Sequence, residues 1–328
     1  MKAAWFNHTG QASEVLHVGS FDDPILLEGH VCVRICASGV NPSDTKKRAG
    51  WGGVEMEFDT VIPHSDGAGI IESVGAGVET SRVGERVWLY NAQWGRAYGT
   101  AAERIVLPSD QAVLLPGTTS FVEGACLGVP ACTAFQALAA ADLLEGKQIL
   151  IHGGAGSVGG YAIQMAKLQG AEVITTVSSA DKEGAARAHG ADVVINYREQ
   201  DVVAALNDVT RGNGVAHIVD VDLGANIDVN AAILQSRGTI ASYSSTALPE
   251  FNFDYYAFGY KGASVHFIQV YLLTPNERSQ AIKSISQWLM DQAIHHRVAQ
   301  EFPLDKIADA HQFQETGAAL GNIVVSVF

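Results

Sequence analysis

Residues 148–167 constrain the fold of this chain more than any other segment. A short apolar run at 149–151 predicts a buried strand and leads directly into a cluster of glycines. Apolar residues then recur at helical spacing, at Val158, Ala162, Met165 and Ala166. A buried strand, a glycine-rich turn and a helix in this order are what a dinucleotide-binding site requires.

Three glycines of the turn, Gly154, Gly156 and Gly159, match the pattern G-x-G-x-x-G. In such sites one glycine makes the tight turn, one lets the backbone approach a pyrophosphate, and one lets the helix pack on the strand. The phosphates then bind free N–H groups at the helix N-terminus. The alternative is a purely structural turn, because glycine is abundant in this chain. The cofactor contacts expected from this turn are Gly154, Ala155, Gly156, Ser157, Val158 and Gly159.

The size and charge of the chain narrow its class. A length of 328 residues suggests about two domains. The formal net charge of −14 argues against a nucleic-acid or anionic-membrane partner, because the negative charge of that partner would repel the chain. The first eight residues lack the apolar core of a signal peptide, and no stretch approaches the roughly 18 apolar residues of a membrane span. The four cysteines form no C-x-x-C pair. We expect a cytoplasmic protein without a membrane span.

Strand and helix signals predict an α/β organisation. Short strand-like runs at 31–37, 69–74, 86–90 and 101–107, separated by turn residues, are typical of a β-barrel or sandwich. An alanine-rich buried helix is predicted at 121–141, where the composition changes. Six further strands then alternate with helical segments, which predicts a doubly wound parallel sheet. These strands are expected at 149–151, 172–177, 193–197, 216–221, 238–243 and 265–269.

The tail beyond residue 274 leaves this alternating pattern. It predicts an amphipathic helix around 281–289, a second helix at 305–314 and a strand at 323–327. The simplest arrangement returns the tail to the first domain. We therefore expect a discontinuous domain of residues 1–122 and 270–328, with a dinucleotide-binding domain of residues 123–269 inserted in it.

Six motifs follow one another along nearly the whole chain: 37–44 (ASGVNPSD), 63–75 (PHSDGAGIIESVG), 83–87 (VGERV), the glycine turn, 194–199 (VINYRE) and 302–311 (FPLDKIADAH). Together they resemble the zinc-independent branch of the medium-chain dehydrogenase/reductase superfamily, most closely the zeta-crystallin-like NADPH:quinone oxidoreductases. The resemblance implies a GroES-like β-barrel catalytic domain interrupted by a Rossmann domain. It also implies NADPH as the cofactor.

The zinc-dependent relatives of this family differ from the chain at their ligands. Their first zinc ligand is a cysteine where this chain has Asn41, and their second is a histidine at the position of Ser65. An amide and a hydroxyl are poor zinc ligands compared with a thiolate and an imidazole. The four-cysteine lobe that carries structural zinc is missing between Trp88 and Arg104. We expect no metal site.

His64 and Asp66, which flank Ser65, have two interpretations. In the first, Asp66 and the glycines after it make a turn while His64 hydrogen-bonds nearby backbone. In the second, both side chains form a polar wall of the substrate cleft.

The strand predicted at 172–177 ends without the acidic residue by which NAD-selective sites hold the ribose hydroxyls. Ser178 and Ser179 stand in its place, and Lys182 follows within one helical turn. Hydroxyls and an ammonium suit a 2′-phosphate, so NADPH is favoured over NADH. Asp181 is the alternative acid, but its place in the first helical turn favours a capping role, with Ser178 or Ser179 as the N-cap.

The family resemblance implies further cofactor contacts. Tyr197 joins Lys182 at the adenosine end of NADPH, and Thr133 lies near the nicotinamide. Ser242, Tyr243 and Ser244 belong to a loop where the ribose of the cofactor passes. Family members often carry a phosphate-binding lysine where this chain has Asn322, so this contact departs from the family pattern.

Asn41 is the catalytic candidate. The matching asparagine of the family lies at the nicotinamide and the substrate, so we expect its amide to donate a hydrogen bond to the acceptor; the alternative is a structural turn with Pro42. A quinone or an enone suits such a site, because a conjugated acceptor spreads the charge of an added hydride itself. Lys46 stands where some relatives have a tyrosine, and Trp51 belongs to a loop that either lines the substrate cleft or packs elsewhere.

The sequence thus predicts an NADPH-dependent quinone or enone reductase. The alternatives are a 2-enoyl thioester reductase and an NADPH-binding protein without activity, crystallin-like or RNA-binding. The resemblance also implies a homodimer or homotetramer joined through the edge strand of the Rossmann sheet at 265–269.

Overall fold

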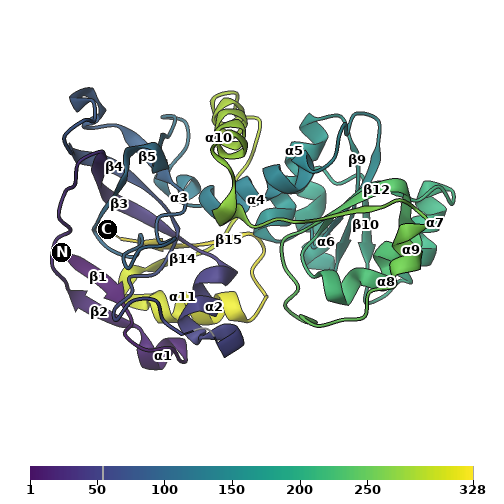
Figure 1. Cartoon of the computed structure of the whole chain (residues 1–328), viewed down its shortest axis with the longest axis horizontal. Helices are drawn as coiled ribbons and strands as arrows, with labels where there is room; N and C mark the ends of the chain where they lie inside the picture. The colour runs from purple at the N-terminus through teal and green to yellow at the C-terminus, as the bar shows by residue number, and fades with distance from the viewer. Residues whose placement is uncertain (54, 328) are drawn as a thin grey trace. The chain divides into compact units, whose positions relative to one another are not determined.

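The computed structural model describes residues 1–53 and 55–327, and its chain forms two units (Figure 1). Unit 1 comprises Met1–Pro130 and Ile282–Phe328, and unit 2 comprises Ala131–Ala281. The boundaries expected near residues 122 and 270 come earlier than these. The difference arises because two helices, α4 (Gly128–Ala139) and α10 (Pro275–Met290), run through the boundaries, and no change of composition marks the middle of a helix.

Unit 1 is built around a seven-stranded sheet in which β14, β15, β3, β4, β5 and β7 are neighbours in that order and β6 pairs with β3. The strands are β3 (His30–Val40), β4 (Asp66–Val74), β5 (Arg86–Leu89), β6 (Arg104–Pro108), β7 (Ala112–Leu114), β14 (Val298–Pro303) and β15 (Asn322–Ser326). The antiparallel pairing of β15 with β3 confirms that the tail returns to the first part of the chain. A separate antiparallel pair consists of β1 (Lys2–Trp5) and β2 (His17–Ser20).

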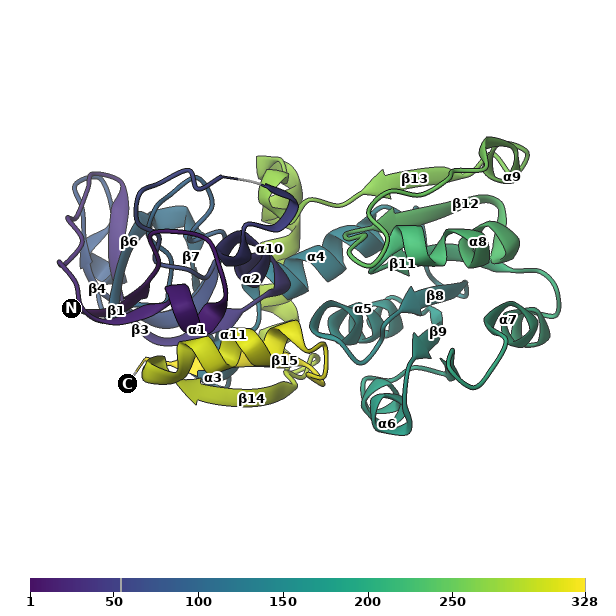
Figure 2. The same ribbon diagram turned by 90° about the horizontal axis from the view of Figure 1, so that it is seen from below.

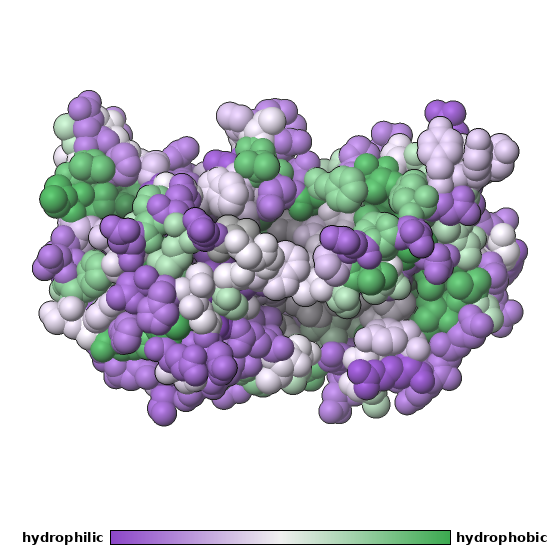
Figure 3. Space-filling model, turned by 60° about the horizontal axis from the view of Figure 1, so that its bottom comes forward, coloured by the Kyte–Doolittle hydropathy of each residue, from purple (hydrophilic) through white to green (hydrophobic). Residues whose placement is uncertain are grey.

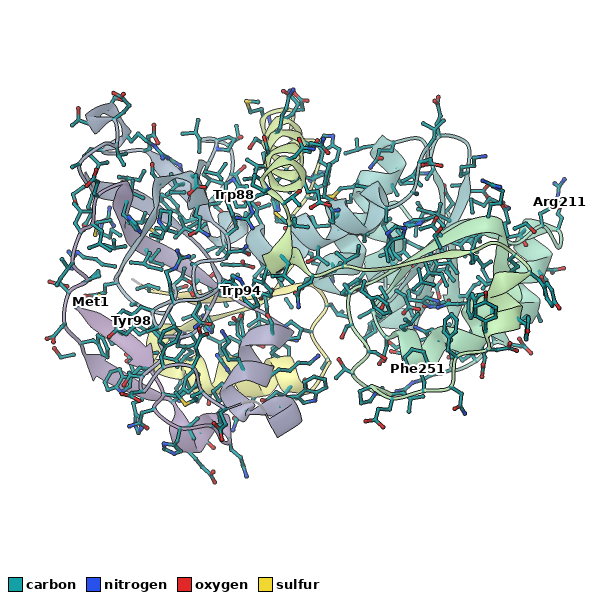
Figure 4. All side chains as sticks on the ribbon, viewed as in Figure 1. Met1, Trp88, Trp94, Tyr98, Arg211 and Phe251 are labelled. Carbon is teal, nitrogen blue, oxygen red and sulfur yellow. The ribbon has the colours of Figure 1, made fainter. Side chains whose placement is uncertain are left out.

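Short helices accompany this sheet: α1 (Ala12–Val15), α2 (Pro42–Ala49), α3 (Phe121–Gly124) and α11 (Ile307–Glu315). The core of the unit consists of aliphatic side chains from most of the strands, including Val33, Ile35 and Ile71. Trp88 on β5 is completely buried in this unit (Figure 4). Along β6, buried positions alternate with partly buried ones, because successive side chains of a strand point to opposite faces and one face packs on the core.

Unit 2 contains a parallel six-stranded sheet with the order β10-β9-β8-β11-β12-β13. This order confirms the doubly wound sheet and places the strand of the glycine motif third from one edge. The strands are β8 (Gln148–His152), β9 (Glu172–Val177), β10 (Val193–Asn196), β11 (Val215–Asp220), β12 (Leu234–Ser242) and β13 (Ser264–Phe267).

The helices of unit 2 are α5 (Ser157–Leu168), α6 (Ala180–Ala188), α7 (Val202–Thr210), α8 (Leu223–Ile233) and α9 (Tyr255–Gly259). Figure 2 shows α5 on one side of the sheet and α7 and α8 on the other. The sheet is therefore covered on both faces, which explains why β8 and β9 read as continuous apolar runs rather than alternating ones.

The single helix predicted at 121–141 is wrong. The structure has two helices, α3 and α4, separated by residues 125–127. The break comes where the carboxylate of Asp66 accepts hydrogen bonds from the backbone N–H of Val129, in the first turn of α4. An acid 63 residues away in the sequence thus supplies the N-terminal cap of the second helix, and local composition does not reveal it. Among the described residues, no helix is both long enough and apolar enough to cross a membrane.

Candidate functional site

The glycine turn joins β8 to α5, and two of its glycines are required by packing. A Cβ atom at Gly154 would lie 2.2 Å from Oγ1 of Thr175, and a Cβ atom at Gly159 would lie 2.3 Å from the carbonyl oxygen of Gly153. Both distances are far below van der Waals contact. These two glycines therefore allow strand, turn and helix to approach one another, as the motif predicts.

Gly156 differs from its neighbours. Its φ of −80° is available to any residue, and a Cβ atom there would meet only the carbonyl oxygen of Gly153, at 3.4 Å. It is the N-cap residue of α5, and no side chain caps that helix end. Packing within the described chain therefore does not require glycine at this position. A pyrophosphate bound at the open N-terminus of the helix would require it, because a side chain would block its approach. The residues present fit the phosphate groups of a dinucleotide.

Several other predicted cofactor residues follow the carboxyl ends of neighbouring parallel strands, so the sheet brings them to one edge. Ser178 comes directly after β9, Tyr197 comes directly after β10, and Ser242 ends β12. The side chain of Tyr197 is half-exposed. Ser179 is the N-cap of α6 and its hydroxyl accepts a hydrogen bond from the backbone N–H of Lys182, which confirms the capping prediction.

The loop after β12 is also ordered by hydrogen bonds. The hydroxyl of Ser242 donates to the carbonyl oxygen of Ser244 at 3.1 Å, and the backbone N–H of Tyr243 donates to the carbonyl oxygen of Asp220 at 3.1 Å. The residues after β12 that are predicted to contact the cofactor thus belong to a loop with a defined conformation. Sequence patterns alone give the position of this loop only approximately.

A buried hydrogen-bonded chain underlies this edge. His152 contacts Oγ1 of Thr176 through Nδ1 and Oδ1 of Asn230 through Nε2, both at 3.0 Å, and the amide of Asn230 donates to Asp220. Because Oδ1 of Asn230 can only accept, His152 carries its proton on Nε2. His152 is therefore a packed residue. Asn230 and Asp220 lie outside the predicted site, because nothing local distinguishes them from other polar residues.

In unit 1, Asn41 is the N-cap residue of α2 and is 4% exposed. Its side-chain Nδ2 donates to Oδ2 of Asp66 at 2.8 Å, and its backbone N–H donates to Oδ2 of Asp44 at 2.8 Å. Burial raises the pKa of Asp44 to about 7 and the pKa of Asp66 to about 8. Asn41, the predicted catalytic residue, is thus held at two points by buried carboxyl groups: its side-chain amide by Asp66 and its backbone N–H by Asp44.

The first interpretation of His64 and Asp66, a turn with hydrogen bonds from His64 to nearby backbone, is wrong. Asp66 opens strand β4 and makes no turn, because its backbone pairs with β3. His64 is fully buried, and its ring contacts Oγ of Ser38 at 2.8 Å and Nε2 of His311 at 2.9 Å, so it does not hydrogen-bond nearby backbone. Asp66 is likewise almost fully buried, with its carboxylate turned to Asn41 rather than to an open wall. A substrate-contacting role for either side chain stays a prediction.

Proton positions follow from this buried cluster. The hydroxyl of Thr100 donates to the carbonyl oxygen of Asp66, so Thr100 accepts from Ser38, and Ser38 accepts from Nδ1 of His64. Nε2 of His64 then accepts the proton of Nε2 of His311. Both imidazoles are neutral in this arrangement.

The cluster predicts a pH dependence of stability. Burial lowers the pKa of His64 to about 3, against 6.5 for an ordinary histidine. Between these values the unfolded chain binds the extra proton, so the contribution of His64 to the free energy of unfolding falls as the pH drops below 6.5. From pH 7 to pH 4.5 this contribution falls by roughly 2 to 3 kcal/mol. Urea unfolding at the two pH values should therefore show that the change from pH 7 to pH 4.5 is less favourable for the wild type than for His64→Asn.

Asp44 and Asp66 have raised pKa values, so their contribution has the opposite sign and is lost as the pH rises towards 8. The contribution of these two acids cancels when the wild type and His64→Asn are compared between the same two pH values. His8→Gln, at an exposed position, is the control and should leave the difference between the two pH values unchanged. An equal pH-dependent loss in His64→Asn and the wild type would contradict the assignment.

The remaining predicted residues are described by their local contacts. Nζ of Lys46 lies 4.7 Å from the ring centroid of Trp51, a cation–π arrangement, and Trp51 is about half exposed. Thr133 is buried on α4. Asn322 opens β15 and its amide donates to the carbonyl oxygen of Arg297 at 3.1 Å, so one of its N–H groups is engaged within unit 1. In the part of the chain that the structure describes, no three His, Cys, Asp or Glu side chains are grouped as metal ligands.

Comparison with known proteins supports this architecture. Residues 27–117 match the alcohol dehydrogenase GroES-like domain, and residues 157–287 match the zinc-binding dehydrogenase family. The crystal structure titled as Escherichia coli quinone oxidoreductase complexed with NADPH is 28% identical, superimposes with a TM-score of 0.88 and covers 100% of both chains. A structure titled as an NAD-dependent alcohol dehydrogenase is 25% identical, with a TM-score of 0.90 and 100% coverage of both chains.

Among curated proteins, the quinone oxidoreductase of Salmonella typhimurium is 30% identical over 324 residues, which are 96% of this chain and 96% of that protein. This similarity extends through both units and includes the two domain types found above. The chain therefore belongs to the quinone oxidoreductase family of the medium-chain dehydrogenase/reductase superfamily.

Proposed function

We propose that the protein is an NADPH-dependent oxidoreductase that transfers a hydride to a quinone or another conjugated carbonyl compound. The observation that carries the proposal is Gly156, where packing leaves the open N-terminus of α5 free for a pyrophosphate. Ser178 after β9, in place of an acid, favours a 2′-phosphate over a free ribose hydroxyl. The relatives named quinone oxidoreductase and the NADPH complex of one of them support the same activity.

When bound, the nicotinamide supplies the hydride, and the chain binds and orients the reactants. The glycine turn would hold the phosphates, while Lys182 and Tyr197 would hold the adenosine end. Asn41 offers an N–H donor for the acceptor oxygen. Asn41 and Ser65 stand at the positions of zinc ligands in metal-dependent relatives. An amide and a hydroxyl polarise a carbonyl only weakly, so an acceptor that delocalises its own charge suits the site.

An acceptor screen tests this function. NADPH oxidation is followed by absorbance with 1,4-benzoquinones, simple enones, 2-enoyl thioesters and unconjugated ketones. We expect turnover with the quinones or enones and little with the ketones. Preference for the thioesters would favour a 2-enoyl thioester reductase. Quenching of tryptophan fluorescence by NADPH, without oxidation by any acceptor, would favour a non-catalytic binding protein.

Lys182→Ala is expected to raise the KM for NADPH about tenfold and to leave the KM for NADH within a factor of two, because only NADPH carries the 2′-phosphate. Steady-state kinetics with both cofactors measures the effect. Arg187→Ala, on the exposed last turn of the same helix, is the matched control. Equal efficiency of the wild type with NADPH and NADH would contradict the cofactor preference.

We also propose a homo-oligomer joined through β13, the edge strand of the unit 2 sheet. Phe267 on this strand is 78% exposed, and Tyr255, Tyr256 and Tyr260 of the neighbouring α9 segment are also exposed. On the face drawn in Figure 3, hydrophobic residues form separate patches among hydrophilic ones. An unpaired edge strand with exposed aromatic residues pairs readily with a second copy.

Phe267→Glu should therefore lower the molar mass measured by light scattering from that of a dimer or tetramer towards that of a monomer. Two like charges would face each other across a two-fold edge contact, and their desolvation would oppose association. Leu114→Glu, on an exposed position of β7 in unit 1, should leave the molar mass unchanged. A monomeric wild type at micromolar concentration would rule the proposal out.

A further inference from the structure

The carboxylate of Asp66 holds the side chain of Asn41 in one orientation. It accepts from Nδ2 of Asn41 at 2.8 Å and from the backbone N–H of Val129 at 2.8 and 2.9 Å. Both oxygens of Asp66 accept the N–H of Val129, and Oδ2 also accepts Nδ2 of Asn41, so Nδ2 faces Asp66 and Oδ1 is turned away from it. The backbone N–H of Asn41 is bound separately by Asp44 at 2.8 Å. Both the main chain and the side chain of Asn41 are thus positioned by buried acids.

The surroundings of Asp66 leave its carboxylate little room to move. A Cβ atom at Gly128 would lie 2.1 Å from Oδ1 of Asp66, and a Cβ atom at Gly39 would lie 3.1 Å from Cβ of Asp66. Neither glycine has a positive φ, so the backbone conformation does not require glycine at these positions. Close approach to Asp66 requires glycine at position 128, whereas at position 39 the nearest atom to an added Cβ is the carbonyl oxygen of Ala125, at 2.1 Å. Thr100 additionally binds the main-chain carbonyl oxygen of Asp66.

The sheet register determines this meeting. Asp66 pairs with Gly39 in the antiparallel ladder between β4 and β3, and Asn41 follows two residues later, at the start of α2. The same ladder therefore fixes the distance between the acid and the amide. Ser65, immediately before Asp66, points its backbone N–H at Asp44, so the two acids share one short segment.

We propose that Asp66 is a positioning residue for Asn41. It engages one N–H of the amide, while the capping box with Asp44 contacts the same side chain, so that Asn41 is held in one orientation at the reactants. The inference rests on the proposed function and adds to it a residue that acts through Asn41 without touching the acceptor. It also gives a role to a nearly fully buried acid, 1% exposed, that lies beside a second acid.

A double-mutant cycle tests the coupling. Asp66→Asn keeps the size of the side chain, but its single acceptor oxygen must serve both Asn41 and Val129. We expect it to lower kcat about tenfold and to leave the KM for NADPH within a factor of two. In the Asn41→Ala background the same substitution should change kcat less than twofold, because the group that it positions is gone. A tenfold loss in both backgrounds would show that Asp66 acts independently of Asn41 and would overturn the inference.

A second measurement does not depend on activity. In ¹⁵N-labelled protein without cofactor, the side-chain amide of Asn41, identified by its loss in Asn41→Ala, should have one hydrogen that exchanges slowly with solvent. In Asp66→Asn both hydrogens should exchange at least about tenfold faster than that one. Asp228→Asn, at an exposed position of α8, is the matched control and should change neither exchange nor kcat. Unchanged exchange in Asp66→Asn would overturn the inference even if its kcat were lowered.

The two measurements separate this inference from the proposed function. Turnover by the wild type, combined with additive effects in the cycle, would leave the function standing and remove the role of Asp66. Absence of NADPH oxidation with every acceptor would remove the proposed function, and the orientation of Asn41 by Asp66 would then be decided by the exchange measurement alone.

Discussion

Gly156→Ala is expected to weaken NADPH binding by about two orders of magnitude while the protein stays folded. The added methyl group meets only one atom of the chain, the carbonyl oxygen of Gly153 at 3.4 Å, and the φ of −80° suits alanine. In a bound complex, however, the methyl group would occupy the space through which the pyrophosphate approaches the N–H groups of α5. Fluorescence titration gives the Kd for NADPH, and thermal unfolding reports the fold.

Gly159→Ala is the matched comparison for this prediction. Its added Cβ would lie 2.3 Å from the carbonyl oxygen of Gly153, so the turn or the helix must shift. We expect a loss of stability of about 1 to 3 kcal/mol, the usual cost of overpacking. The two substitutions thus separate a glycine required by the ligand from one required by packing. A Gly156→Ala protein with wild-type affinity would show that the cofactor does not approach this turn.

Asn41→Ala is expected to lower turnover with 1,4-benzoquinones about 100-fold, the cost of removing one hydrogen-bond donor that is aimed at developing charge. The Kd for NADPH should change less than threefold, because the phosphates and the adenosine end are bound elsewhere. Steady-state kinetics and a binding titration measure the two effects. Asn207→Ala, on an exposed position of α7, is the control.

The alternative role of Asn41, a structural turn with Pro42, predicts a different result. Loss of the N-cap of α2 would cost about 1 kcal/mol of stability and would leave turnover of the folded protein unchanged. Thermal unfolding of the same variant therefore has to be measured beside its kinetics. Wild-type turnover in a destabilised Asn41→Ala protein would remove this residue from the catalytic site.

Much of the Rossmann domain is predictable from the sequence because its signals are local. The run at 172–177 corresponds residue for residue to β9, and all six predicted strands are present in the doubly wound order. Buried parallel strands read as continuous apolar runs, and a glycine turn has a strict spacing, so neither depends on distant residues. Strand β14, by contrast, is not predicted, because its residues Val298–Pro303 mix apolar and charged side chains and pair in parallel with β15.

The candidate site divides in the same way. The sequence by itself determined the glycine turn and the absence of an acid after β9, because each is a short motif whose chemistry lies in its own residues. Asn41 followed from the family resemblance of the motif at 37–44. Only the tertiary structure decided that Asp66 binds Asn41 and caps α4, and that His64 stacks against His311, which follows it by 247 residues. These contacts depend on the register of β3 against β4 and on the return of the tail to unit 1. Both are set by packing over the whole unit, and no local pattern records them.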